Sequence, residues 1–139
     1  MTYPTTVEKY LSTYALLPGG CPDLSGEWQH VLVVPCYDES PGFVEDFCRT
    51  HGSTSILLLL VFNRPEGSPS TVNQQLRDRL AVWPHEAIKP GYTLHRASES
   101  LSILSVDLEC LEGETPRHQG VGRARRTGCD LALALMDKG

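Results

Sequence analysis

The feature that most constrains the fold is a pair of continuous apolar runs, each followed by a short polar loop and a helix-start signal. The first run extends from His30 to Pro35 and the second from Ser55 to Phe62. An uninterrupted apolar run of this length is typical of a strand buried on both faces, as in parallel sheets. The sequence therefore predicts two consecutive strand–loop–helix units whose strands pair in parallel through right-handed crossovers.

The segments that follow the two runs have the composition of helices. Ser40–Pro41 is predicted as an N-cap followed by the first helical position, and Gly52 as the stop. After the second run, Ser68–Pro69 is predicted to begin a helix that ends before Pro84. Apolar residues recur at helical spacing in both segments, so each helix is expected to bury one face.

The remaining elements have weaker patterns. We predict a leading helix over residues 5–17, short strands at Tyr92–Arg96 and Leu101–Leu108, and a final helix from about Gly120. Together the elements predict an α/β fold: a three-layer, Rossmann-like, mostly parallel sheet with flanking helices.

The predicted organisation is an N-terminal helix and loop extension, residues 1–29, followed by one α/β domain, residues 30–139. The last predicted helix has an apolar face, and in an α/β fold such a helix is normally followed by another strand. We therefore expect the domain to be truncated at its C-terminal end.

Composition excludes several classes of protein. The formal net charge is −5, which argues against a general binder of nucleic acid or anionic membranes. No apolar run approaches the ~18 residues of a membrane span, and the N-terminus lacks the pattern of a signal peptide. The five cysteines form no CxxC pair, which favours reduced thiols over a disulfide framework. We expect a cytoplasmic protein without a membrane segment in this chain.

Polar residues gather where the predicted parallel strands end. Ligands of open parallel sheets bind outside the carboxyl ends of the strands, so the loops there are the candidate binding site. The candidate residues lie in three segments, after the first strand, after the second strand and at the start of the last helix: Pro35, Tyr37, Asp38, Glu39, Asn63, Gly122, Arg123 and Arg126.

Two of these segments carry a family resemblance. Val-Val-Pro-Cys-Tyr-Asp-Glu, residues 33–39, resembles the opening strand and loop of family 2 glycosyltransferases. Gly-Val-Gly-Arg-Ala-Arg-Arg-Thr-Gly, residues 120–128, resembles the segment that precedes the metal-binding strand of that family. The resemblance implies the GT-A fold and a nucleotide-diphosphate sugar as the donor, with residues 30–139 as the nucleotide-sugar-binding half.

The resemblance also implies roles for the candidate residues. Asp38 or Glu39 would accept hydrogen bonds from the base or ribose, since an ionised carboxylate is only an acceptor. Asn63 would read the base edge, although the family more often has an acidic residue in this region. Gly122 at a helix start, with Arg123 or Arg126, would bind the diphosphate through backbone N–H groups and guanidinium groups.

The family's metal motif and catalytic base are not found in this chain. The family's Asp-x-Asp motif binds Mn²⁺ or Mg²⁺ and follows the Arg-bearing helix, whereas Asp107-Leu-Glu109 precedes it. We expect Asp107 and Glu109 to form the polar face of an edge strand and this chain alone to bind no metal. The full-length enzyme would use the divalent cation to transfer a sugar to an unknown acceptor, and this chain alone would be inactive.

Other interpretations of the same residues stay open. Asp38 and Glu39 would also favour the dipole of the following helix, and the Arg residues would also suit a solvated helix face paired with Asp130. A non-catalytic α/β module that binds nucleotide or protein is the second hypothesis, with self-association through an exposed sheet edge. A Rossmann dinucleotide enzyme is disfavoured because the first strand is not followed by a glycine-rich turn.

Overall fold

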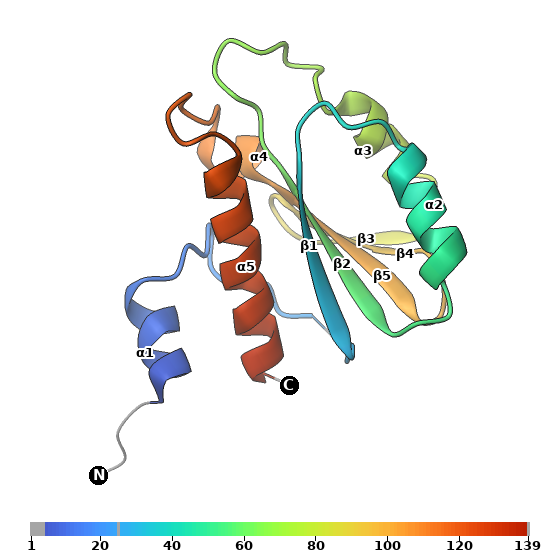
Figure 1. Ribbon diagram of the computed structural model, residues 1–139, viewed down its shortest axis with the longest axis horizontal. Coiled ribbons are helices and arrows are strands. Elements are labelled where there is room, and N and C mark those ends of the chain that lie inside the picture. The colour runs from blue at the N-terminus through green and yellow to red at the C-terminus, as the bar shows by residue number, and fades with distance from the viewer. Residues whose placement is uncertain (1–4, 25, 139) are drawn as a thin grey trace.

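The computed structural model describes residues 5–24 and 26–138, so residues 1–4 and 25 of the predicted extension, and Gly139, lie outside the described residues. The chain folds as an α/β structure in which helices flank both faces of a five-stranded mixed sheet (Figure 1). The strands are β1 (His30–Cys36), β2 (Ile56–Phe62), β3 (His85–Lys89), β4 (Tyr92–Arg96) and β5 (Leu101–Asp107).

The sheet has the strand order β1-β2-β5-β4-β3. β1 and β5 each pair in parallel with β2, as the two strand–loop–helix units predict. β4 pairs antiparallel with β5, and β3 pairs antiparallel with β4. The expectation of a mostly parallel sheet was therefore correct only in part, because the sheet is mixed. The turn at Pro90–Gly91 joins β3 and β4 directly, and so short a connection produces an antiparallel hairpin.

The two apolar runs do not occupy equivalent places in the sheet. Every residue of β2 is buried, as expected for a central strand between β1 and β5. β1 lies at the edge of the sheet. Its residues are exposed or half-buried except Cys36, and Leu32 is 43% exposed. The prediction that β1 would be buried on both faces was wrong, because hydrophobicity predicts burial but the strand order decides which strand lies at the edge.

The helices form the two outer layers. α2 and α3 cover one face of the sheet, and α5 covers the other with α1 beside it (Figure 1). The bounds of the helices are α1 (Thr6–Thr13), α2 (Gly42–His51), α3 (Gln74–Leu80), α4 (Leu108–Glu112) and α5 (Gly120–Lys138). α5 begins where it was predicted, whereas α4 was not predicted.

Two helix starts differ from the predictions. α2 has Pro41 at its N-cap and no side-chain cap, so Ser40 does not cap it. α3 begins at Gln74 with Asn73 at the N-cap, several residues after Ser68–Pro69. The hydroxyl of Ser68 instead donates to the carbonyl of Pro65 and closes a turn. A Ser-Pro pair favours a turn as well as a helix start, and here the turn is formed.

The predicted extension packs on α5. Tyr10 donates its hydroxyl proton to the Asp130 carboxylate at 2.6 Å, and the Leu16 amide donates to the same carboxylate at 2.7 Å. Asp130 is only 4% exposed. Tyr92 of β4 also donates to the carbonyl of Pro18. These contacts attach α1 and the following loop to the same face of the sheet as α5.

Candidate functional site

The loop after β1 has an unusual backbone. Asp38 has φ of 53°, and among the described residues no other non-glycine residue has a positive φ. A left-handed conformation costs an L-residue about 1–2 kcal/mol, and such strain persists only where surrounding contacts maintain it. The side chains of Tyr37, Asp38 and Glu39 are all exposed at this carboxyl end of β1. They form the exposed part of the candidate site.

Asn73 holds this loop in place from the start of α3. Its side-chain oxygen accepts a hydrogen bond from the Asp38 amide at 3.1 Å, and its side-chain nitrogen donates to the Asn63 carbonyl at 2.9 Å. The Asn63 amide in turn donates to the Cys36 carbonyl. One buried side chain thus connects the loops after β1 and β2. Sequence reasoning missed Asn73, although its position at a helix N-cap is typical of asparagine.

Asn63 is connected to Asp38 only through the side chain of Asn73, and its own side chain is buried. The residue is 2% exposed, and its side-chain oxygen has no hydrogen-bond partner among the described residues. A buried acceptor without a donor costs about 1–3 kcal/mol. Asn63 therefore has an unused acceptor beneath the loop, and contact with a base edge remains a prediction that requires this side chain to turn outward.

The loops after β2 and α4 also converge. Pro65 and Thr115 form an isolated parallel bridge, and the Glu66 amide donates to the Thr115 carbonyl. The Arg117 amide donates to the Glu66 carboxylate at 3.1 Å. The loop after β2 is therefore linked both to the loop after β1 and to the loop before α5.

Arg123 and Arg126 lie on the flank of α5 that faces α4 and α1. Arg123 pairs with the Glu112 carboxylate, and Arg126 donates to the Tyr14 carbonyl at 2.8 Å. With Gly122 they line a small pocket of about 290 Å³ on this flank. None of the pockets lined by these residues also contains Asp38 or Glu39. Neither of these two pockets therefore brings the predicted arginines together with the loop after β1.

Arg125, which was not among the predicted site residues, lies on the flank of α5 nearest β1. Gly128 of α5 packs directly on Val33 of β1 and Val61 of β2. Arg125 lies about one turn before Gly128, so it shares the side of α5 nearest β1. It is exposed and has no ion pair or hydrogen bond within the described ranges. The contact of Gly128 with β1 is tertiary, and sequence alone could not tell which arginine faces it.

Asp107 and Glu109 do not form the polar face of an edge strand. Asp107 ends β5, which lies in the middle of the sheet, and Glu109 belongs to α4. Arg77 lies 3.2 Å from Asp107, and Arg64 lies 2.5 Å from Glu109. Among residues 5–24 and 26–138, no group of three or more His, Cys, Asp and Glu side chains has a geometry that would hold a metal ion. Because both carboxylates already pair with arginines, they do not suit a divalent cation.

Burial keeps two titratable side chains of the sheet neutral, Cys36 of β1 and His95 of β4. Burial raises the pKa of the Cys36 thiol to about 12, and the nearby Glu39 carboxylate adds to the shift. A thiol with so high a pKa is not a nucleophile at neutral pH. Burial also lowers the pKa of His95 to about 4, with a further contribution from His85. The Nδ1 of His95 lies 3.0 Å from the Leu80 carbonyl, to which it donates as the neutral ring.

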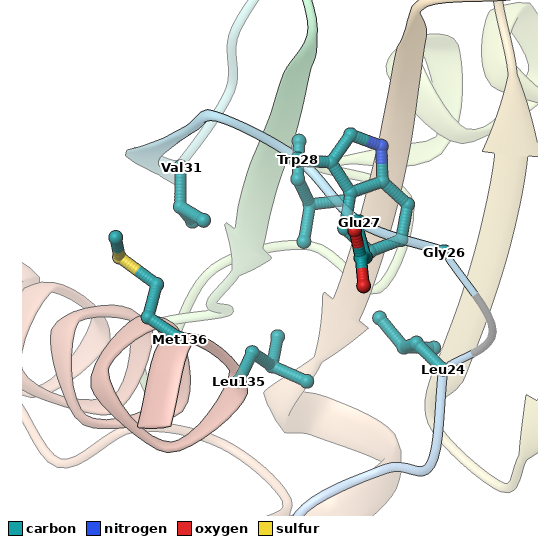
Figure 2. A pocket seen from close by; sticks show the side chains of 8 residues that line it. Leu24, Gly26, Glu27, Trp28, Val31, Leu135 and Met136 are labelled. Carbon is teal, nitrogen blue, oxygen red and sulfur yellow. The ribbon is translucent and has the colours of Figure 1, made fainter. Parts of the chain in front are cut away.

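A further pocket lies away from all of these loops. It has a volume of about 460 Å³ and lies at the amino end of the parallel strands (Figure 2). Figure 2 shows Leu24 and Leu135 pointing into the space beneath Trp28, with Val31 of β1 and Met136 of α5 beside it. This pocket contains none of the residues predicted to bind nucleotide.

The comparisons with known proteins add no family. No protein-family model, curated protein or solved structure matches the chain. None of the helices in the described part of the chain is both long enough and apolar enough to cross a membrane.

Proposed function

We propose that the chain is the nucleotide-binding part of a GT-A-like glycosyltransferase that binds a nucleotide-diphosphate sugar at the carboxyl ends of β1 and β2. The full enzyme would transfer the sugar to an acceptor in the cytoplasm with the help of Mn²⁺ or Mg²⁺. The residues described here do not supply the metal site, so this chain binds the nucleotide and does not turn over.

The proposal rests on the loop after β1, whose residue Asp38 has a left-handed backbone that a hydrogen bond to Asn73 stabilises. Asn73 maintains the left-handed Asp38, and the exposed carboxylates of Asp38 and Glu39 follow the first of three parallel strands. Carboxylates in such a position accept hydrogen bonds from the N–H groups of a base or from ribose hydroxyls. The exposed ring of Tyr37, 47% accessible, offers a surface on which a base can stack.

The phosphates need positive charge, and the loop after β1 has none. α5 begins at the same end of the sheet as this loop (Figure 1). In its first turn the Gly120 and Arg123 amides donate to loop carbonyls, which leaves the amides of Val121 and Gly122 for a ligand. Arg125 adds a guanidinium group on the β1 side that has no partner among the described residues. We therefore assign the diphosphate to Arg125 in place of Arg123 and Arg126, whose guanidinium groups already have partners on the other flank.

Calorimetric titration of the purified chain with UDP and GDP, with and without Mn²⁺, tests the proposal. The informative variant is Asp38→Asn, because asparagine also tolerates a left-handed backbone and only the charge is lost. Losing a charge-assisted hydrogen bond of about 1.5–3 kcal/mol predicts at least about ten-fold weaker binding. Arg125→Gln should weaken binding of UDP more than binding of uridine.

Matched controls separate the site from general effects of charge. Arg126→Gln removes an arginine from the other flank of α5, and we expect it to leave UDP affinity within two-fold of the unaltered chain, taking about 0.4 kcal/mol as the limit for a distant residue. If neither UDP nor GDP binds while NAD binds tightly, the transferase proposal is wrong. If none of the three binds, the non-catalytic module that binds protein becomes the better description.

A further inference from the structure

The open edge of β1 has no charged side chain to protect it, and its one proline, Pro35, lies near its carboxyl end. No lysine, arginine, aspartate or glutamate occurs in β1, whose sequence is His-Val-Leu-Val-Val-Pro-Cys. The other edge strand, β3, carries Glu86 and Lys89 and is mostly exposed. Charged side chains on an edge prevent pairing with another chain. The two edges of this sheet therefore differ, and only β3 has charged protection.

The backbone of β1 has free hydrogen-bonding groups at defined positions. The His30 amide donates to Ser55, and the Cys36 carbonyl accepts from Asn63, so the even-numbered residues face β2. The peptide groups of Val31 and Val33 consequently face outward. Pro35 also faces outward, where its missing N–H breaks no hydrogen bond within the sheet.

Apolar pockets flank this edge on both faces of the sheet. On the α2 face, a pocket of about 400 Å³ is lined by Leu32, Val34, Phe43 and Phe47. On the α5 face lies the pocket of Figure 2, beside Val31. A strand added to β1 would cover both pockets with alternate side chains, because successive side chains of a strand point to opposite faces.

We propose that β1 pairs antiparallel with β1 of a second copy of this chain, about a two-fold axis through Leu32. In this register Val31 of each copy faces Val33 of the other, and all four outward peptide groups of these residues are paired. Pro35 lies beyond the ladder, opposite Gln29 of the second copy. The edge is thus complementary to itself, as a two-fold interface requires.

The side chains and charges fit the same axis. Leu32, which is half-exposed, meets Leu32 of the second copy over the pocket on the α2 face. The α2 helices of the two copies lie on the same face and run in opposite directions. Asp46 and Arg49 of α2 form an ion pair within one chain at 3.0 Å and are both more than two-thirds exposed, so each α2 carries both signs of charge on the face where the two copies of α2 lie.

Disulfide crosslinking tests the register. In the proposed pairing, residue 32 faces its own copy at about 4.5 Å between Cα atoms, within the range of a disulfide. Leu32→Cys, in a background with Cys110→Ser and Cys129→Ser, should form a covalent dimer on mild oxidation, with the 32–32 link identified by peptide mass mapping. Val34→Cys is the matched control on the same strand and face. It would lie about 14 Å from its own copy, too far to crosslink.

Sedimentation equilibrium tests the assembly itself. We expect the unaltered chain to dimerise and Leu32→Lys to weaken the dimer at least ten-fold, while Val82→Lys, at an exposed valine remote from the edge, leaves it unchanged. Circular dichroism checks that the variants fold. A chain that stays monomeric up to high micromolar concentration overturns the proposal. Efficient crosslinking of Val34→Cys with none of Leu32→Cys overturns the register.

Discussion

At the scale of single residues, Asn73 does most to shape the candidate site. Its side chain satisfies one amide and one carbonyl from two loops that are far apart in sequence, and it is 1% exposed. Because both partners are backbone groups, the contact does not depend on the identity of Asp38 or Asn63. No local pattern predicts it, since asparagine at a helix N-cap usually bonds within its own helix.

Removing this side chain should destabilise the fold and loosen the loop. Asn73→Ala leaves the Asp38 amide and the Asn63 carbonyl without partners, and we expect a loss of about 2 kcal/mol in the free energy of unfolding by urea denaturation. Gln74→Ala, one residue later and exposed, should change it by less than about 0.5 kcal/mol. An equal effect of the two variants would contradict the role assigned to Asn73.

His95 predicts a pH dependence of stability. Its pKa is lowered by burial to about 4 in the fold, against about 6.5 in an unfolded chain, so the unfolded state binds the extra proton between these values. Stability is complete above about pH 6.5 and falls as the pH is lowered toward 4, by at most about 3 kcal/mol.

Urea denaturation across this pH range is the measurement that checks the histidine prediction. His95→Gln keeps a donor and an acceptor and should flatten the dependence, whereas His118→Gln, at an exposed residue, should leave the slope unchanged. If the free energy of unfolding of His95→Gln depends on pH as steeply as that of the unaltered chain, groups other than His95 cause the acid sensitivity.

At the scale of elements, the glycines of α5 have opposite roles. A Cβ added at Gly128 would lie 2.4 Å from a methyl group of Val33 and 3.0 Å from one of Val61, whereas one at Gly122 would meet nothing within 4 Å. Gly128 thus permits α5 to lie close to β1 and β2. The family resemblance includes both glycines of this segment. Only the packing shows that Gly128 is needed for close contact with the sheet and that Gly122 is not.

Alanine substitutions should therefore change stability in opposite directions. Gly128→Ala creates a clash in the core and should lower the free energy of unfolding by about 1–3 kcal/mol. Gly122→Ala removes backbone freedom from an exposed helical position and should raise it by about 0.5–1 kcal/mol. Thermal unfolding of the pair provides the comparison. A stabilised Gly128→Ala would mean that α5 packs further from the sheet than described.

At the scale of the whole molecule, the N-terminal extension is bound to α5 through hydrogen bonds to Asp130. Tyr10 and the Leu16 amide bind its two carboxylate oxygens, and the hydrogen bond from Tyr10 to Asp130 raises the pKa of the phenol. The sequence suggested Asp130 as a partner of the arginines, and Arg126 does lie 3.7 Å away. The stronger contacts come from residues more than a hundred positions earlier in the chain.

Tyr10→Phe tests this attachment. It removes one hydrogen bond and keeps the ring, so we expect faster amide hydrogen exchange across α1 with unchanged protection in β2 and β5. Tyr14→Phe, on the same helix end and with no hydrogen bond from its hydroxyl among the described residues, is the control. Uniform loss of protection in both variants would instead indicate a general destabilisation.

The sequence by itself determined the α/β class, the parallel pairing of β1 with β2, the helix from Gly120 and the position of Asp38 after the first strand. Apolar runs, turn residues and helical periodicity are local properties, and they act on each segment separately. Only the tertiary structure decided that β1 lies at an edge, that β3 and β4 make the sheet mixed and that Arg125 shares the side of β1. The physical reason is that strand order and helix rotation depend on contacts between segments distant in sequence, such as Gly128 with Val33, which no local pattern records.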